Sequence, residues 1–354
     1  MAPGPQISVV SRLGRAIRWR KERVLQRKER ILRRVYGRSG VLARLARYPI
    51  PLLAPWRLNE IHLLRWGKAI GDALLCTPAI RELKRRNPGC RVHFYTDMPD
   101  LLRGLKYIND IRPTSEAPAD HIAMQYENAT PTQAHLARIM GDQLGLKISD
   151  TTPDCAVDAN LVERWRSAWN YLPRPHMLIL RRASNWTPNK DWQDASWATL
   201  IGSLAQFGTV IETGAAEKPM GPDVGSYVDL RGRTSLDELA AAVAAADMYI
   251  GPISGPMHIA AAVGTPAVVI VGGYEHPRGI EYKGQTYLYT PVPCAPCWLR
   301  EPCPFDRKCL AAISPATVER LVRETWATGA TLTREAPPKT LEMPVLPANL
   351  IAAR

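Results

Sequence analysis

Short apolar runs alternate with helix-length segments through the middle of the chain. The runs span residues 60–65, 91–96, 177–180, 209–213 and 267–271, and a polar or glycine-containing turn follows each of them. Several of the segments between them carry apolar residues at helical spacing. Strands and helices that alternate in this way predict parallel sheets with helices packed on them, which is an α/β fold.

The stretch 250–273, IGPISGPMHIAAAVGTPAVVIVGG, is the clearest single unit. A strand, a tight turn, a helix from about Met257 to Val263 and a second strand at 267–271 form one βαβ unit of a parallel sheet. The turn presents backbone N–H groups at a helix N-terminus, where an anion can sit. Gly255 has no Cβ to prevent a ligand from approaching closely. Small residues are also ordinary at such turns, so phosphate binding and plain chain reversal are both open.

A second unit begins with the run at 60–65 and carries Asp72 at the start of its helix, which continues through 73–86. A carboxylate in this place is often a cap or a partner of the helix dipole. It also lies at the carboxyl end of a strand, where open sheets bind ligands, and can act there as a general base. Residues 126–128 (Tyr-Glu-Asn) lie at the end of a weaker predicted strand and offer polar groups to the same predicted cleft.

Two candidate ligand-binding side chains follow strands in the second half of the chain. Lys190 lies in the long, polar and basic loop 181–192, where a lysine can hold a phosphate as a point charge. An ordinary exposed lysine is the alternative. Glu217 comes after the run at 209–213, and a carboxylate at that place can bind ribose hydroxyl groups.

Proline-containing segments divide the chain. Prolines at 49, 51 and 55 interrupt any helix, and Pro173-Arg174-Pro175 resembles a hinge. The predicted divisions are a helical arm with its linker (1–55), a first Rossmann-like domain (56–173), a second Rossmann-like domain with the cysteine cluster (174–329) and a proline-containing tail (330–354).

Length and composition agree with this division. A chain of 354 residues with 46% hydrophobic residues is long enough for two α/β domains with cores of their own. No apolar run approaches the roughly 20 residues of a membrane-spanning helix, and the N-terminus lacks the pattern of a signal peptide. We therefore expect a cytoplasmic protein that is soluble or bound to a surface.

The net charge of +13 is concentrated in the arm. Residues 1–47 hold 14 arginine and lysine residues and two glutamates, which leaves the rest of the chain at +1. Within 11–37, apolar residues at helical spacing predict a basic amphipathic helix. The partner we favour is an anionic membrane surface, where each cation contributes about 1 kcal/mol. A contact in an oligomer ranks second, and nucleic acid third.

Four of the seven cysteines cluster as Cys294, Cys297, Cys303 and Cys309, with the spacing C-x2-C-x5-C-x5-C. Four thiols are enough for a structural zinc ion or an iron–sulfur cluster, and a structural metal is the interpretation we favour. Free thiols packed in a loop are the close alternative. Disulfides are not expected in a chain without an export signal.

Three stretches, taken in order, resemble the heptosyltransferase family (glycosyltransferase family 9), whose members have the two-domain GT-B architecture. They are GDALLCTPAIR (71–81), LRGRTSL (230–236) and SGPMHIAAA (254–262), and the C-x2-C-W stretch 294–298 is similar to a pattern common in that family. The resemblance spans about 60–324. It implies two Rossmann-like, doubly wound domains that face a cleft, preceded here by the basic arm.

The resemblance also implies a reaction and the residues that perform it. The reaction is transfer of a sugar from a nucleotide donor, typically ADP-heptose, to a lipopolysaccharide core acceptor, with inversion and without a metal. Asp72 matches the family's catalytic base, Lys190 its pyrophosphate-binding lysine and Glu217 its ribose-binding carboxylate. The phosphate-facing turn and helix start match Ser254, Gly255, Pro256, Met257 and His258. An enzyme of this kind would work on the inner face of the cytoplasmic membrane as a peripheral protein, with a glycolipid as acceptor.

One position departs from the family's pattern. The family usually has an aspartate before the Ser/Thr-Gly pair, and this chain has Ile253. Because that aspartate is expected to help hold donor or acceptor, its replacement bears both on which substrate is bound and on whether the chain is active. Two alternatives follow: a transferase that modifies a protein such as an adhesin, and a non-catalytic binding or assembly protein that keeps the GT-B fold.

Overall fold

The computed structural model describes residues 58–130, 132–183, 187–216, 221, 225–328 and 339–342. All of them belong to one compact unit of the chain. The predicted arm, Glu217 and most of the predicted tail lie outside the described residues. Among the residues that are described, no helix is both long enough and apolar enough to cross a membrane.

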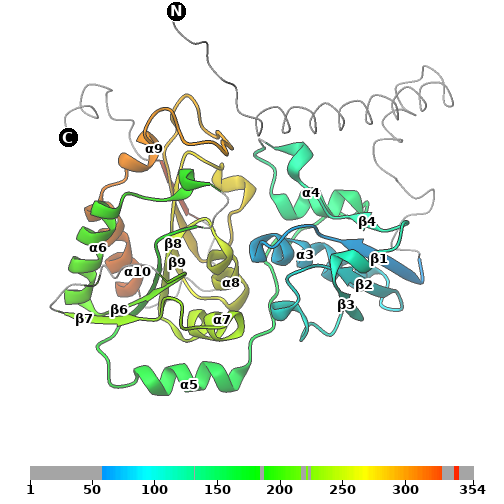
Figure 1. Ribbon diagram of the computed structural model, residues 1–354, viewed down its shortest axis with the longest axis horizontal. Coiled ribbons are helices and arrows are strands. Elements are labelled where there is room, and N and C mark those ends of the chain that lie inside the picture. Colours follow the sequence, from blue (N-terminus) through cyan, green and yellow to red (C-terminus); the bar gives the residue numbers. More distant parts are fainter. Residues whose placement is uncertain are drawn as a thin grey trace, which may run out of the picture. The chain divides into compact units, whose positions relative to one another are not determined.

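The first sheet has four parallel strands in the order β3-β2-β1-β4. The strands are β1 (Glu60–Leu64), β2 (Arg91–Tyr95), β3 (Asp110–Arg112) and β4 (Ile122–Ala123). Helices α3 (Ile70–Arg86) and α4 (Leu136–Gln143) belong to this part (Figure 1), with short 3-10 turns η2 (Asp100–Leu102), η3 (Thr114–Glu116) and η4 (Glu127–Ala129). The strands predicted at 60–65 and 91–96 and the helix predicted at 73–86 are thereby confirmed.

The second sheet has seven parallel strands in the order β11-β10-β9-β8-β5-β6-β7. The strands are β5 (His176–Leu180), β6 (Thr209–Thr213), β7 (Ser226–Asp229), β8 (Met248–Pro252), β9 (Ala267–Gly272), β10 (Gln285–Tyr289) and β11 (Lys339–Glu342). The helices are α5 (Ala159–Trp169), α6 (Asp194–Phe207), α7 (Leu236–Ala245), α8 (Gly255–Val263), α9 (Lys308–Ala311) and α10 (Pro315–Ala327), with 3-10 turns η5 (Pro188–Lys190) and η6 (Pro277–Gly279). Strand β11 lies within the segment predicted as a tail, where no strand was expected.

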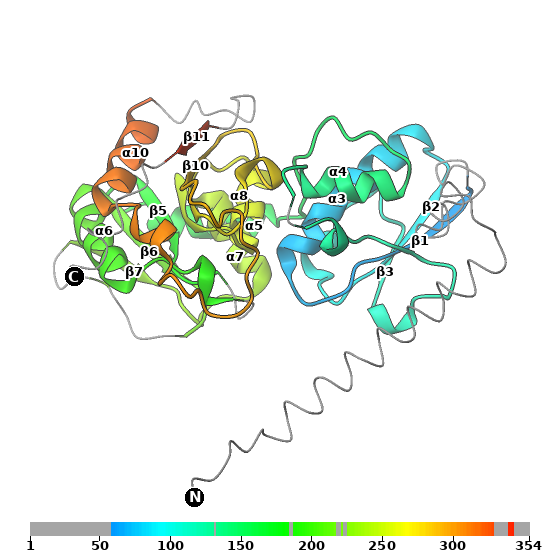
Figure 2. The same cartoon turned by 90° about the horizontal axis from the view of Figure 1, so that it is seen from above.

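Helices cover both faces of the second sheet: α6 and α10 lie on one side, α7 and α8 on the other (Figures 1 and 2). Alternate strand residues point to opposite faces, so a central strand meets helices through both of its faces. In β5, Met177 and Ile179 pack in the cluster that holds α6 and α10 side chains. Leu178 and Leu180 pack in the cluster with α7 and α8. This arrangement explains the continuous apolar runs in the sequence and confirms the α/β prediction.

Local chemistry fixes where the helices begin, bend and end. Helix α7 starts with a capping box between Ser235 and Glu238. Helix α8 ends at Gly264, whose φ of 82° is left-handed. Inside α3, Pro78 has no N–H for the carbonyl of Leu74, and the Thr77 hydroxyl donates to that carbonyl at 2.7 Å instead. The helix that carries Asp72 therefore continues through its proline.

Candidate functional site

Helices α3 and α8 touch at their first turns, at the carboxyl ends of β1 and β8. A Cβ on Gly71 would lie 2.6 Å from Cδ2 of His258, and a Cβ on Gly255 would lie 2.1 Å from Cγ2 of Ile70. Both glycines are therefore required by the contact between the two helices. The expectation that Gly255 leaves space for a ligand needs correction, because Ile70 occupies the space beside its missing side chain.

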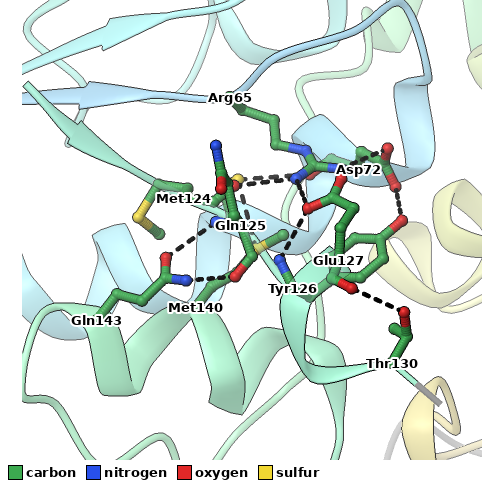
Figure 3. Close-up of polar contacts among 10 residues, drawn as sticks. Arg65, Asp72, Met124, Gln125, Tyr126, Glu127, Thr130, Met140 and Gln143 are labelled. Carbon is green, nitrogen blue, oxygen red and sulfur yellow. Dashed lines mark hydrogen bonds and ion pairs between the residues drawn. The ribbon is translucent and has the colours of Figure 1, made fainter. Parts of the chain in front are cut away.

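Asp72 lies in the first turn of α3, and its carboxylate accepts two side-chain hydrogen bonds (Figure 3). Arg65 Nη2 donates to Oδ2 at 2.7 Å, and the Tyr126 hydroxyl donates to Oδ1 at 2.8 Å. The Asp72 side chain keeps 22% of its surface exposed. It does not cap the helix, since the N-cap residue is Ala69 and no side chain bonds there. These contacts rule out a role as N-cap, and they are compatible both with a partner of the helix dipole and with a general base.

Arg65 is a buried cation with carboxylates on two sides. Its side chain is 2% exposed, and its two terminal nitrogens donate to Glu127 at 2.6 and 3.1 Å and to the Met124 carbonyl at 3.0 Å. Burial alone would lower the pKa of Arg65, but Asp72 and Glu127 raise it well above the ordinary value. The guanidinium is therefore a permanent positive charge beside Asp72.

A row of aromatic rings connects Asp72 to Lys190. The Tyr126 ring lies 6.3 Å from the Trp298 ring, which lies 5.7 Å from the Tyr274 ring. The Lys190 ammonium lies 4.7 Å from the centre of the Tyr274 ring and pairs with the buried carboxylate of Glu275. A series of side-chain contacts thus links two residues separated by 118 positions in sequence.

The loop that carries Lys190 is held by the cysteine-bearing loop. Asn189 is 4% exposed, and its amide nitrogen donates to the carbonyls of Leu299 and Glu301 at 2.8 and 2.7 Å. Its amide oxygen accepts from the Cys303 N–H at 3.0 Å. The position of Lys190 thus depends on residues more than 100 positions away.

The turn before α8 offers its backbone, while its side chains are packed inside. The Ser254 hydroxyl bonds to Tyr249 and to the Pro252 carbonyl and does not cap the helix. Pro256, Met257 and His258 are buried. Any anion at this place would therefore meet main-chain N–H groups.

His258 is a buried, neutral ring. Its Nδ1 lies 2.7 Å from the Tyr282 hydroxyl. Burial, helped by the charges of Lys190 and His135, lowers the pKa of His258 to about 3. Ile253, the position that departs from the family's pattern, is 5% exposed and belongs to the apolar core.

The four clustered cysteines are free thiols near one another. Burial, followed by the neighbouring thiols, raises the pKa of Cys297 and Cys309. Within the ranges that the structure describes, no three His, Cys, Asp or Glu side chains are arranged to hold a metal ion. The four thiols as described do not form a metal site. A metal at Cys294, Cys297, Cys303 and Cys309 stays a prediction, which metal analysis of the purified protein would test.

Sequence reasoning pointed to Asp72, Lys190 and the α8 turn but missed several of their neighbours. It found no signal for Arg65, Glu275 or Asn189. Tyr126 and Glu127 were noted only as polar groups at a strand end. Trp298 has a left-handed φ of 48°, and a bulky residue in that conformation often marks a functional site. A small polar pocket lies at the carboxyl ends of β5 and β6, with Glu212 in its wall.

Comparisons with known proteins agree with this geometry. The family model for Glycosyltransferase family 9 (heptosyltransferase) matches residues 120–301, about half of the chain. Lys190 and the α8 turn fall within the match, and Asp72 precedes it. No curated protein matches the chain.

Several solved structures share the fold. A glycosyl transferase family 9 protein from Veillonella parvula DSM 2008 has a TM-score of 0.58 at 14% identity, over 77% of this chain and 98% of that one. The ADP-heptose LPS heptosyltransferase II of E. coli has a TM-score of 0.57 at 14% identity, over 76% and 99%. TibC, a dodecameric iron-containing heptosyltransferase from E. coli solved with ADP-D-β-D-heptose, has 0.58 at 18% identity, over 77% and 78%.

These neighbours show the GT-B fold. Together with the family match, the two parallel sheets with their helices identify the chain as a member of glycosyltransferase family 9, and hence as a glycosyltransferase.

Proposed function

We propose that this glycosyltransferase moves a heptose from an ADP-sugar to a hydroxyl group of a lipopolysaccharide-type surface glycan, with inversion at the anomeric carbon. The observation that carries the proposal is the row of aromatic rings that connects Asp72 to Lys190. An inverting displacement needs a base for the attacking hydroxyl on one side of the anomeric carbon and positive charge at the leaving group on the other. Asp72 and Lys190 supply these two groups.

The steps follow from these two charges. Asp72 takes the proton of the acceptor hydroxyl while the oxygen of that hydroxyl forms a bond to the anomeric carbon. The bond between that carbon and the diphosphate oxygen breaks, and its electron pair leaves with ADP. The Lys190 ammonium offsets the negative charge that develops on the diphosphate. No metal enters these steps, and turnover is expected to persist in the presence of a chelator.

The start of α8 is the proposed second support for the diphosphate. The N–H groups of Gly255 and Met257 lie in the first turn, where no preceding helical carbonyl can accept from them. Ser254 and His258 contribute by fixing the turn, because their side chains bond inward to Tyr249 and Tyr282. Glu217 is assigned to the ribose by its resemblance to the family alone.

The choice of ADP and heptose comes from the similar proteins, one of which is described with ADP-D-β-D-heptose. The choice of a membrane-bound glycan as acceptor comes from the basic residues of 11–37, which suit an anionic membrane. In a liposome co-sedimentation assay, the full chain should bind vesicles with anionic lipid, and a chain that begins at Trp56 should not. Equal binding by both would remove the arm from the proposal.

Two measurements test the function. Calorimetric titration with ADP should show binding to the wild-type protein and to Asp72→Ala alike, because the base does not touch the nucleotide. Transfer from ADP-heptose to a heptose-deficient lipopolysaccharide should be lost in Asp72→Ala, by about a hundredfold or more. Undiminished turnover in that variant would exclude Asp72 as the base. Absence of ADP binding would favour a binding or assembly protein, and mass spectrometry of acceptors would reveal a protein substrate.

A further inference from the structure

We propose that Tyr126 and Arg65 are positioning residues for Asp72, and that they aim its free lone pairs at the acceptor hydroxyl. This inference rests on the function proposed above. The two donors reach Asp72 from separate segments, Arg65 from the end of β1 and Tyr126 from the connection between β4 and α4 (Figure 3). Each takes a different carboxylate oxygen, at 2.7 and 2.8 Å.

Two bonds to two oxygens fix the plane of the carboxylate. An ionised carboxylate has about four lone-pair sites, and Arg65 and Tyr126 take one on each oxygen. The remaining sites belong to a side chain that is 22% exposed, so a substrate hydroxyl can reach them. A base that is held in one orientation spends more of its time in the geometry that reacts, because rotation about its side-chain bonds is restricted.

Tyr126 is itself held by two contacts to its ring. The Arg65 guanidinium lies 4.8 Å from the centre of its ring, and Trp298 packs against it. Burial, and after it the charge of Asp72, raises the pKa of Tyr126 well above its ordinary value. The hydroxyl therefore remains protonated and donates to Asp72 throughout the neutral pH range.

Glu127 balances the charge of Arg65. It accepts from both terminal nitrogens of the guanidinium, so Arg65 is locked by a two-point contact as well as by the Met124 carbonyl. One cation is thus shared between two carboxylates. The group as a whole keeps one negative charge, because Arg65 offsets only one of the two carboxylates.

The chain contains a second carboxylate with the same kinds of partner, which serves as an internal control. Asp154 accepts from Arg81 of α3 and from the Tyr107 hydroxyl, the latter at 2.7 Å. The Asp154 N–H donates to Thr77, so this set fastens the middle of α3. Tyr107→Phe therefore removes a similar hydrogen bond from the same helix without touching the proposed base.

The experiment compares Tyr126→Phe, Arg65→Lys and Tyr107→Phe with the wild type in the transfer assay described above. Tyr126→Phe should lower kcat about tenfold, with the KM for ADP-heptose and the affinity for ADP unchanged. Arg65→Lys should also lower kcat, because an ammonium cannot contact both carboxylates in the same way. Tyr107→Phe should keep the wild-type kcat even where its melting temperature falls.

A double variant separates positioning from general damage. If Tyr126 acts through Asp72, adding Tyr126→Phe to Asp72→Ala should cost no further turnover, because the base that it positions is gone. A wild-type kcat in Tyr126→Phe would overturn the inference, and so would equal losses of kcat in Tyr126→Phe and Tyr107→Phe. Full turnover in Asp72→Ala would instead overturn the proposed base, which keeps the two failures distinct.

Discussion

At the scale of single residues, Lys190 shows how the proposed donor site would work. Its side chain is 15% exposed, its ammonium pairs with Glu275, and the face of Tyr274 lies beneath it. Glu275 is 4% exposed, so its carboxylate depends on this cation. A bound diphosphate would share the ammonium with Glu275, since a lysine has three N–H groups to give.

Replacement of Lys190 by alanine should therefore weaken ADP binding. A hydrogen bond to a charged group is worth about 1.5–3 kcal/mol, so we expect an increase in Kd of roughly ten- to a hundredfold by calorimetry. The double variant Lys190→Met/Glu275→Gln should bind ADP as weakly as Lys190→Ala but be more stable, because no buried carboxylate is left unpaired. A wild-type Kd in Lys190→Ala would exclude the diphosphate from this position.

Lys308 offers a matched control for that measurement. Its ammonium lies 4.7 Å from the centre of the Phe305 ring, the same separation as between Lys190 and Tyr274. Lys308→Ala removes a comparable cation–π contact and one positive charge. It should leave the Kd for ADP unchanged, whereas a loss equal to that of Lys190→Ala would indicate an effect of net charge alone.

The residues that sequence reasoning found and missed differ in what identifies them. Asp72 and Lys190 stand at turns after strands, and that position is visible in the sequence. Arg65 is recognised by its contacts with Asp72 and with Glu127, which is 62 positions further along the chain. Glu275 is recognised only by its contact with Lys190, 85 positions earlier. Partners of this kind are set by how the elements pack, and a single sequence does not contain that information in readable form.

At the scale of elements, the loop that carries Lys190 depends on a second loop for its shape. The Asn189 side chain bonds to the carbonyls of Leu299 and Glu301 and to the Cys303 N–H. The Leu299 carbonyl also accepts from the Thr187 hydroxyl at 3.1 Å. Trp298 has a left-handed φ, and the bond from Asn189 holds the cysteine-bearing loop at the next residue, Leu299. The order of the cysteine-bearing loop and the order of the donor loop are therefore linked.

Asn189→Ala should destabilise the protein and weaken ADP binding together. A hydrogen bond contributes about 0.5–1.5 kcal/mol net, and the buried Asn189 amide makes three of them, so we expect a loss of about 2–4 kcal/mol of unfolding free energy in urea. The Kd for ADP should rise because Lys190 loses its support. Asn87→Ala, which loses a 2.9 Å bond to the Leu58 carbonyl in the first sheet, should leave that Kd unchanged. An unchanged Kd in Asn189→Ala would contradict the link between the loops.

The elements were predictable where a strand is apolar on both faces. β5 and β9 are buried along their whole length, and their sequences carry long apolar runs. β10 is equally buried but begins with Gln285, whose amide donates to the Met257 carbonyl. β11 is mostly exposed at the edge of the sheet. A strand with polar residues that are paired by tertiary contacts has no unbroken apolar run, and neither has an exposed edge strand. Strands β10 and β11 were therefore missed.

At the scale of the whole molecule, the contact between α3 and α8 connects the helices of the first sheet with those of the second in the described residues. Buried histidines lie beside that contact: the His258 ring meets Gly71, and the His135 ring lies 5.4 Å from the Tyr282 ring that His258 bonds. Burial lowers the pKa of both histidines to about 3, with Arg138 adding to the effect at His135 and Lys190 at His258. Protonation of either ring would place an uncompensated charge among apolar groups.

Acid should therefore weaken the fold well before the carboxylates titrate. The unfolded chain takes up these protons near pH 6.5 and the folded chain only near pH 3, so the stability is complete above pH 6.5 and falls on acidification. Between pH 7.5 and 5.5, each histidine should cost about 1.4 kcal/mol of unfolding free energy in urea. His135→Asn should remove one such contribution, so the difference between the two pH values should shrink by that amount. An unaltered difference in the variant would show that His135 takes up its proton as readily in the folded protein as in the unfolded one.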